Sequence, residues 1–342
     1  MSLEHPRVSI AIPAFNEAEV LPELLERVGV LLDSLPGGPH ELVIVDDGST
    51  DGTPDILRRA ATLDHRIVVV ALARNFGHQP ALTAALDHVT GDVAVIMDAD
   101  LQDAPEVIPT MLQHYREGYD VVYAQRASRP EGLILRACYF LFYRMLAALA
   151  EVQLPLDSGD FALLSRRVVL HLRRMPEHHR YLRGLRTWVG FRQLGLPVAR
   201  QPRVSGSSKY GLLRLVKLAT DGLFAFSTIP LRVASVIGAG AITACSLFAV
   251  YAIYAKLVLD RSPKGFTALF VAVTFLAGVQ LLFLGVIGEY LGRVYEEVKG
   301  RPLYVVARLT RAGQPQSPPN PEGAGVGGLA SRAADVGETT GT

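Results

Sequence analysis

The amino-terminal part of the sequence alternates between the two hydrophobic periods that distinguish strands from helices. Short apolar runs rich in Val and Ile occur at residues 8–12, 42–45, 67–72, 93–97 and 121–124. Segments with helical spacing separate these runs, at residues 19–35, 53–63, 80–89 and 106–117. This alternation predicts a parallel sheet covered by helices on both faces, with ligands bound at the carboxyl ends of the strands.

Two long apolar segments constrain the carboxyl-terminal part. Residues 233–255 and 265–288 contain no charged residue, and each would rise about 35 Å as a helix, which is enough to cross a bilayer. The connection between them is short and contains Pro263, so we expect a two-helix transmembrane hairpin with both ends on one side. Basic residues near the hairpin favour cytoplasmic ends by a small margin. Hydrophobic residues make up 49% of the chain and charged residues 20%, as expected for a soluble part joined to a few membrane segments.

Several classes of protein lack their required features here. The net charge of +1 gives no case for a nucleic-acid-binding protein, and the two cysteines lie in separate apolar stretches, which excludes a disulfide framework and a Cys-based zinc site. We expect no cleaved signal peptide, because the start lacks a basic segment followed by an apolar one. Neither a phosphate-binding P-loop nor a dinucleotide fingerprint is present, and the serine-hydrolase and zincin motifs are also missing.

Acidic side chains follow two of the predicted strands. Asp46 and Asp47 close the second strand, and Asp98 and Asp100 close the fourth. In a parallel sheet these carboxylates meet at one edge, where they would repel one another unless a cation or hydrogen-bond donors compensate. Mg²⁺ or Mn²⁺, shared with substrate phosphates, suits that role. For Asp51 we instead expect helix capping.

The motifs resemble those of one enzyme family. In order along the chain they are PAFNE at 13–17, DDGS at 46–49, RNFG at 74–77, DADLQD at 98–103, YAQR ending at Arg126, DSGDF at 157–161 and SSKY at 207–210. This order resembles the family 2 glycosyltransferases. The similarity is closest to the branch that makes polyprenyl-phosphate sugars, namely dolichol-phosphate mannose synthases and the bacterial GtrB-like and ArnC-like enzymes, and it covers about residues 6–305.

The resemblance implies an α/β fold and a division of the chain. It implies a GT-A catalytic domain, Rossmann-like with a mostly parallel sheet, with interfacial helices and a carboxyl-terminal two-helix transmembrane hairpin. The segments follow in this order: a GT-A domain at 1–210, an interfacial helix at 211–228, the hairpin at 229–290, a cytoplasmic segment returning to the catalytic domain at 291–310 and a disordered tail at 311–342. The tail is rich in Gly, Pro, Ser and Ala, a composition typical of disorder.

The resemblance also implies roles for particular residues. Binding of the nucleotide sugar falls to Pro13, Ala14, Glu17, Asp47, Ser49, Arg74, Gln79 and Asp98. The ligands of Mg²⁺ or Mn²⁺ are Asp98, Asp100 and Gln102. The catalytic carboxylates are Asp157 and Asp160; the sequence does not choose between them as a base, and we rank Asp157 first.

The acceptor site is expected on a basic stretch. Between residues 161 and 220 the only acidic residue is Glu177, whereas basic residues are numerous, as on a surface that faces anionic headgroups and a lipid phosphate. We expect most of these basic residues to form a solvated face. The exceptions are Arg126, Arg203 and Lys209, which lie in or beside family motifs and are predicted to bind the lipid phosphate.

The resemblance implies a membrane-bound inverting glycosyltransferase that moves a hexose, best glucose from UDP-glucose, onto polyprenyl (undecaprenyl) phosphate. The expected location is the cytoplasmic face of a bacterial inner membrane, as a multi-pass protein and a homo-oligomer. GDP-mannose, UDP-galactose and a modified UDP-arabinose stay open as donors. A processive polysaccharide synthase is disfavoured because Thr187 precedes the single tryptophan, Trp188, where such enzymes carry Gln-x-x-Arg-Trp. A non-catalytic, membrane-anchored scaffold that binds sugar nucleotides is the alternative of another class.

Overall fold

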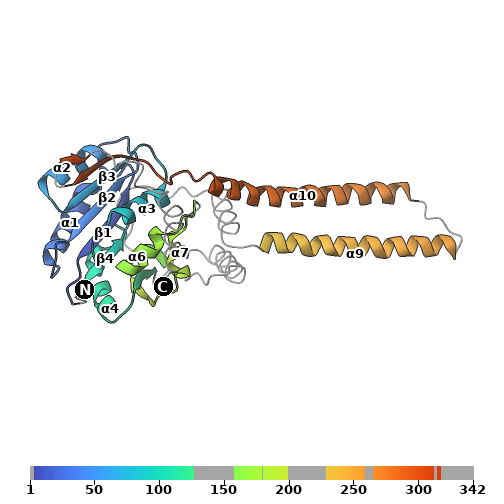
Figure 1. Cartoon of the computed structure of the whole chain (residues 1–342), viewed down its shortest axis with the longest axis horizontal. Coiled ribbons are helices and arrows are strands. Elements are labelled where there is room, and N and C mark those ends of the chain that lie inside the picture. The colour runs from blue at the N-terminus through green and yellow to red at the C-terminus, as the bar shows by residue number, and fades with distance from the viewer. Residues whose placement is uncertain are drawn as a thin grey trace, which may run out of the picture.

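The computed structural model describes residues 4–126, 158–178, 180–198, 229–258, 265–311 and 314–316. Figure 1 shows a globular part built on a sheet, from which two long helices project. Within the described residues the sheet has nine strands in the order β7-β5-β6-β4-β1-β2-β3-β8-β9. The chain therefore has a mixed α/β fold.

The central strands are those that the hydrophobic alternation predicts. They are β1 (Val8–Ala14), β2 (Glu41–Asp46), β3 (Ile67–Leu72) and β4 (Val93–Ile96), and they pair with one another in parallel, in the order β4-β1-β2-β3. The predicted helices are also present, as α1 (Leu21–Ser34), α2 (Thr53–Leu63), α3 (His78–His88) and α4 (Ile108–Arg116), with a short 3₁₀ turn at Pro105–Val107 before α4. The prediction of a parallel sheet flanked by helices is confirmed for this half of the fold.

Antiparallel strands extend the sheet on both sides. β6 (Ser158–Ser165) lies between β4 and β5 (Val121–Arg126) and is antiparallel to both, and β7 (Gln193–Val198) pairs with β5 in parallel. On the other side, β8 (Val306–Arg311) is antiparallel to β3, and β9 (Gln314–Gln316) pairs with β8. The tail predicted to be disordered from residue 311 thus begins inside a strand, because Arg311 pairs with β3, and Gln314–Gln316 pair in turn with β8.

The two faces of the sheet carry separate cores. On β1, Ile10 and Ile12 pack against the layer that contains α1, whereas Ala11 packs against the layer that contains α3. This alternation follows from the period of two along a strand. The second layer also includes residues of α6 (Arg166–Arg173) and α7 (Leu182–Trp188), so the segment after β6 folds back onto the sheet.

A polar contact fastens the segment that enters β8. The hydroxyl of Tyr304 donates a hydrogen bond to Asp87 Oδ2 of α3, with an O···O distance of 2.7 Å. The amide of Ala73 donates to the carbonyl of Val305 at 2.9 Å, which continues the pairing beyond the end of β3. Burial raises the pKa of Tyr304, so its hydroxyl keeps its proton at neutral pH.

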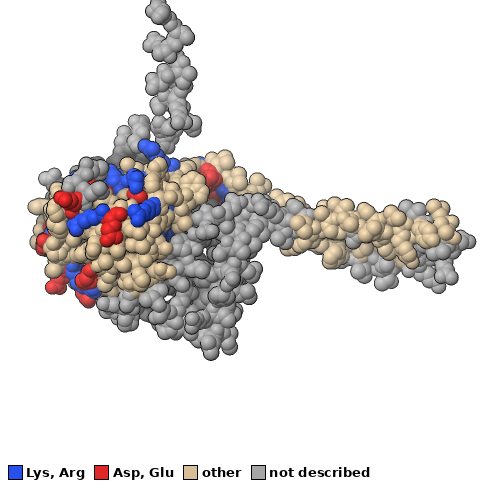
Figure 2. All heavy atoms as spheres, turned by 90° about the horizontal axis from the view of Figure 1, so that it is seen from below, with Lys and Arg blue, Asp and Glu red and all other residues tan. Residues whose placement is uncertain are grey.

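The two predicted membrane segments lie in α9 (Ile229–Leu257) and α10 (Phe266–Val298). Within the described residues, Phe275–Val298 is the one stretch whose length and composition suffice to cross a membrane, and the apolar part of α9 is shorter, Val236–Phe248. Figure 2 shows that charged side chains gather on the globular part, whereas the described projection is tan beyond the end that joins that part. The structure thus supports one candidate membrane helix, and the two-span hairpin stays a prediction.

Candidate active site

Two loops at the carboxyl edge of the sheet are tied together by their own polar groups. The loop after β1 donates from the amide of Asn16 to Ser49 Oγ at 2.9 Å, and Asn16 Oδ1 accepts from the amide of Thr50 at 2.8 Å. Asn16 adopts a left-handed conformation, with φ of 56°, which asparagine tolerates better than most residues. These bonds hold the PAFNE and DDGS motifs as one unit.

The RNFG loop is fixed onto this unit by Asp47 and Gly48. Asp47 accepts hydrogen bonds from the amides of Phe76 at 2.8 Å and Gly77 at 2.9 Å, one on each carboxylate oxygen. Burial raises the pKa of Asp47, and the two amide hydrogen bonds oppose that rise. Gly48 has φ of +70°, and a Cβ there would lie 2.5 Å from the carbonyl carbon of Arg74. Only glycine lets the two loops approach this closely.

The loop after β4 presents two carboxylates from a bent backbone. Asp98 and Asp100 flank Ala99, and Asp100 Oδ1 accepts from the amide of Gln102 at 3.2 Å. Leu101 has φ of +54°, which is unusual for a bulky residue, and its side chain is only 1% exposed. Burial of Leu101 thus anchors the turn, while the carboxylates stay at its surface.

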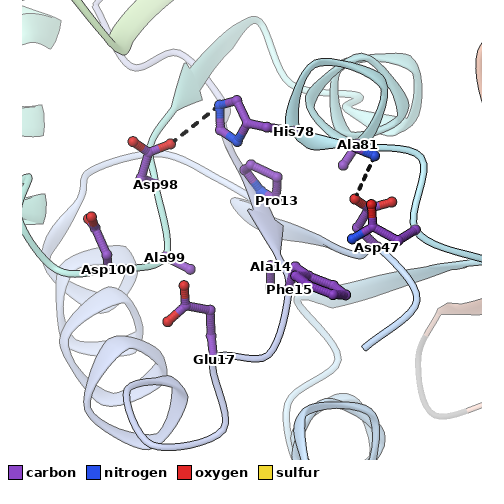
Figure 3. Close-up of a pocket in the computed structure, with 12 residues that line it drawn as sticks. Pro13, Ala14, Phe15, Glu17, Asp47, His78, Ala81, Asp98, Ala99 and Asp100 are labelled. Carbon is purple, nitrogen blue, oxygen red and sulfur yellow. Dashed lines mark hydrogen bonds and ion pairs between the residues drawn. The ribbon is translucent and has the colours of Figure 1, made fainter. Parts of the chain in front are cut away.

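These loops surround a cleft of about 270 Å³ at the carboxyl edge of the sheet. Figure 3 shows Asp98, Asp100 and Glu17 around the same opening, with His78 facing Asp98 across it. The lining residues are Pro13, Ala14, Phe15, Glu17, Asp47, Asn75, Gly77, His78, Ala81, Asp98, Ala99 and Asp100. A smaller recess, lined in part by Asp160 and Arg183, shares Asp98 with this cleft.

A chain of charged side chains runs between the cleft and the recess. His78 Nε2 lies 3.7 Å from Asp98 Oδ1 and 3.6 Å from Asp160 Oδ2. Arg183 donates to both oxygens of Asp160, at 2.7 Å from Nε and 2.8 Å from Nη2. These residues come from the β4 loop, α3, β6 and α7, so the folded sheet brings together four separate parts of the sequence.

The surroundings of Asp160 and His78 determine the charge states of these two side chains. Burial alone would raise the pKa of Asp160, but Arg183 and His78 outweigh it and hold that pKa well below the usual carboxyl range. Interaction with Asp160 raises the pKa of His78, with a further contribution from Asp98, although burial opposes the rise. Asp160 is therefore ionised at neutral pH and a poor proton acceptor.

The structure brings together some of the predicted site residues and separates others. Those that line the cleft are Pro13, Ala14, Glu17, Asp47, Asp98 and Asp100, and Asp160 lines the adjoining recess. The predicted residues outside the cleft lining are Ser49, Arg74, Gln79 and Gln102. Gln79 Oε1 accepts a hydrogen bond from the amide of Leu182 at 3.0 Å, which joins α3 to α7. Arg126 is the last residue of β5, whereas Asp157, Arg203 and Lys209 lie outside the described residues.

Sequence reasoning missed His78 and Arg183. His78 stands in the NFGHQ segment, directly after the RNFG motif, but nothing local shows that it faces two carboxylates. Arg183 lies in the stretch 161–220 that is expected to form a solvated basic face, whereas it pairs with a largely buried aspartate. A usable signal was the presence of Asp160 in a buried strand, since a carboxylate there requires a partner.

The expectation of a solvated basic face is wrong for several other arginines. Arg173 donates from Nε to the carbonyl of Leu86 at 2.8 Å, near the end of α3. Arg180 donates to the carbonyls of Leu172 at 2.8 Å and Met175 at 2.7 Å. These guanidinium groups turn inward because carbonyls at helix ends have no partner within the helix.

The carboxylates in the cleft suit a hard divalent cation. Asp98 and Asp100 offer oxygen ligands, which Mg²⁺ and Mn²⁺ prefer. In the described part of the chain no group of three or more His, Cys, Asp or Glu side chains is arranged to hold a metal. Two carboxylates suffice for a divalent ion when substrate phosphates and water complete its coordination.

Known proteins are similar to this chain over most of its length. Residues 9–173 match the family model described as glycosyl transferase family 2. The chain is 40% identical over 305 residues to YkcC, an uncharacterized glycosyltransferase of Bacillus subtilis, which covers 89% of this chain and 94% of the relative. It is 37% identical over 306 residues to the SfII prophage-derived bactoprenol glucosyl transferase of Shigella flexneri, covering 89% and 99%. It is 34% identical over 315 residues to an undecaprenyl-phosphate 4-deoxy-4-formamido-L-arabinose transferase of Edwardsiella ictaluri, covering 90% and 95%.

Proposed function

The chain belongs to the family 2 glycosyltransferases, in the branch that acts on polyprenyl phosphates, and we propose that it transfers glucose from UDP-glucose to undecaprenyl phosphate. The observation that carries this proposal is the cleft in a GT-A-like fold, where Asp98 and Asp100 face Glu17 at the carboxyl edge of the sheet. The relative from Shigella flexneri, named for glucosyl transfer, favours glucose as the sugar.

The donor occupies the cleft in this proposal. Pro13, Ala14, Glu17 and Asp47 hold the nucleoside, since they follow the first two strands and line the opening. Ser49 and Arg74 lie in the neighbouring loops and Gln79 lies in α3, all outside the lining, and they support the donor through the backbone around the cleft. Asp98 lies toward the ribose and the diphosphate.

Asp98, Asp100 and Gln102 are the proposed holders of Mg²⁺ or Mn²⁺. A divalent cation bound there supplies positive charge to the diphosphate that leaves in the reaction. The side chains contribute oxygen ligands, and the buried Leu101 keeps the turn that carries them in one conformation. The protein thereby presents a preorganised site, which lowers the reorganisation required during transfer.

The acceptor phosphate attacks the anomeric carbon of the sugar. A bond forms between a phosphate oxygen and that carbon while the bond from the carbon to the donor diphosphate breaks, so an α-linked donor gives a β-linked product. A phosphate monoester has a second pKa near 6, so much of the acceptor is already a dianion and little proton removal is required. Asp160 then orients Arg183 and His78, which fits its low pKa, and Asp157 stays the first-ranked base if one acts.

We place the reaction at a membrane surface. The apolar stretch Phe275–Val298 is the candidate span, and the relative from Edwardsiella ictaluri is named for undecaprenyl phosphate, a lipid phosphate. In this proposal the catalytic domain at 1–210 lies on the cytoplasmic face of a bacterial inner membrane, the helices at 229–290 form a hairpin, and the chain assembles as a homo-oligomer. Arg126, Arg203 and Lys209 bind the lipid phosphate.

Transfer of labelled sugar tests the proposal directly. The full-length chain, purified in detergent, is mixed with undecaprenyl phosphate, Mg²⁺ or Mn²⁺, and one of four labelled donors: UDP-glucose, UDP-galactose, GDP-mannose or a UDP-4-amino-arabinose derivative. We expect a lipid-linked product with UDP-glucose that disappears on chelation. Product from another donor alone would replace glucose in the proposal, with the arabinose derivative the second candidate because of the Edwardsiella ictaluri relative. Donor binding without product from any of the four would support a scaffold instead.

A further inference from the structure

His78 occupies a special place between the donor cleft and the acceptor side. It is the first residue of α3, and its ring nitrogen Nε2 lies between Asp98 on the β4 loop and Asp160 on β6, at 3.7 and 3.6 Å. Figure 3 shows the ring and the Asp98 carboxylate pointing toward one another. His78 thus has ion-pair contacts to both carboxylates.

The backbone around His78 is fixed by the donor site itself. Asp47 binds the amides of Phe76 and Gly77, the two residues before the histidine. Gly77 has φ of +103°, a conformation that sets the direction in which α3 begins. The ring of His78 is therefore placed by the same loops that line the donor cleft.

The other side of His78 meets a carboxylate that does not move freely. Asp160 is held on both oxygens by Arg183, and its side chain is only 8% exposed. Behind it stands Arg186, which is 3% exposed and donates from Nη1 to the carbonyl of Gly159 at 3.3 Å. Among the described residues, its Nε and Nη2 have no hydrogen-bond partner. This second buried guanidinium adds positive charge beside Asp160, so that carboxylate is a fixed anion against which the histidine is held.

We propose that His78 is a positioning residue that links the donor carboxylate Asp98 to the anchored Asp160. Its imidazole separates two carboxylates that would otherwise repel each other, and it keeps Asp98 turned toward the donor diphosphate. Its role depends on the polar ring nitrogen that faces both carboxylates rather than on the bulk of the ring. This inference rests on the proposed function, because it assigns His78 to the site where that function places the nucleotide sugar.

Two substitutions distinguish the polar ring nitrogen of His78 from the bulk of its side chain. His78→Leu removes the nitrogen and keeps an apolar side chain, whereas His78→Gln places an amide NH₂ near the position of Nε2. We expect His78→Leu to raise the KM for the nucleotide sugar about tenfold or more and to leave the KM for undecaprenyl phosphate within about threefold. His78→Gln should restore most of the affinity for the nucleotide sugar. The matched control is His88→Gln at the other end of α3, where the ring bonds to the carbonyl of Ala84, and we expect no change in either KM.

A binding measurement makes the test independent of turnover. The affinity for UDP in the presence of Mn²⁺ is measured by calorimetry on the full-length wild-type chain and on the three variants, together with their thermal unfolding. Weaker UDP binding by His78→Leu, restored in His78→Gln at equal unfolding temperature, supports the inference. Equal loss in both variants, a loss explained by unfolding, or unchanged binding in His78→Leu each overturns it. If the wild-type chain binds UDP but forms no product with any sugar donor, the proposed function fails while the positioning role of His78 is still decided by the binding data.

Discussion

The two halves of the globular part use side chains of opposite charge to bind backbone groups near helix ends. In the half built from β1 to β4, carboxylates accept hydrogen bonds from backbone amides, as Asp47 does from Phe76 and Gly77 before α3. In the half built from β6 to β7, guanidinium groups donate to backbone carbonyls at helix ends, as Arg173 does to Leu86. Both arrangements satisfy backbone groups that a helix leaves without partners.

The two halves differ in whether their charged side chains can still bind a cation or a substrate. The carboxylates of the first half sit at the edge of an open cleft, so they can still meet a cation or a substrate. The arginines of the second half are largely used within the fold. A count of charges along the sequence therefore overestimates the basic surface of the second half, while it locates the acidic cleft of the first half correctly.

The largest expected effect comes from removing a carboxylate of the cleft in the first half. Asp100→Ala removes a proposed metal ligand at a surface turn, so we expect kcat to fall by about a thousandfold, equivalent to roughly 4 kcal/mol, with little change in stability. Steady-state transfer assays in Mg²⁺ and thermal unfolding give the two quantities. Near-normal turnover would show that the first half binds its donor without this carboxylate.

The next effect tests whether the loops of the first half form one unit. Gly48→Ala places a Cβ 2.5 Å from the backbone of Arg74 at a positive φ, so we expect the free energy of unfolding to fall by roughly 3 kcal/mol. Gly29→Ala in α1 is the matched control, because no atom lies within 4 Å of its added Cβ. That control should stabilise the protein by about 0.5 to 1 kcal/mol. Denaturant unfolding measures both, and equal effects would mean that the loops separate freely.

The second half is tested by removing the arginine that holds Asp160. Arg183→Met leaves this carboxylate largely buried without its bidentate partner, and we expect a loss of about 2 kcal/mol in the free energy of unfolding, less than for a fully buried pair because Arg183 is 30% exposed. Arg58→Met breaks an exposed pair with Asp55 on α2 and should change stability by less than about 0.5 kcal/mol. If both substitutions cost the same, the second half would behave as a solvated face after all.

The pH dependence of the stability lost in Arg183→Met tests whether Asp160 is ionised in the folded protein. Asp160 has a folded pKa below its unfolded value, so its contribution to stability is complete above the ordinary carboxyl pKa of about 3.9 and is lost as the pH falls through the depressed folded value. The difference between the wild type and Arg183→Met should therefore be largest near neutral pH and shrink as the pH falls, because the variant's buried Asp160, without Arg183, takes up a proton at a higher pH than the wild-type group. Unfolding curves recorded from pH 3 to pH 7 measure it. A constant difference over this range would contradict the low pKa of Asp160.

The smallest effect concerns the contact that joins the carboxyl-terminal segment to α3. Tyr304→Phe removes the hydroxyl that bonds to Asp87, and we expect a loss of about 1 kcal/mol in the free energy of unfolding. Denaturant unfolding of the full-length chain in detergent is the measurement. Tyr295→Phe, on the exposed surface of α10, is the control and should have no measurable effect.

The same contrast explains which features the sequence could predict. Strands β1 to β4 and the carboxylates at their ends follow local rules, because each strand carries its own hydrophobic pattern and each Asp follows directly after it. The mutual arrangement of these loops was beyond local rules: the partners of Asp47 are backbone amides in a loop about thirty residues away.

The second half was harder because its elements depend on distant parts of the chain. β6 begins at Ser158, inside the DSGDF motif, and the sequence predicts a site there rather than an antiparallel strand between β4 and β5. β8 contains Arg308 and Arg311 and lacks a clear alternation of apolar and polar residues. It lies near the edge of the sheet, beside the short β9, and most of its residues are exposed or only partly buried. His78 and Arg183 both contact Asp160 only after the two halves have folded, which no spacing in the sequence reveals.

The position of β8 has a consequence for the order in which the chain can complete its fold. The strand is made after α10, yet it covers β3, whose sequence IVVVAL would otherwise stand at the edge of the sheet. Until the ribosome has passed both long helices, that edge lacks its neighbour, and an exposed apolar edge strand readily pairs with other chains. A version cut before α9 to obtain a soluble enzyme would keep this open edge permanently, so aggregation rather than lost chemistry would limit its use; appending residues 300–316 to such a version supplies the missing strand.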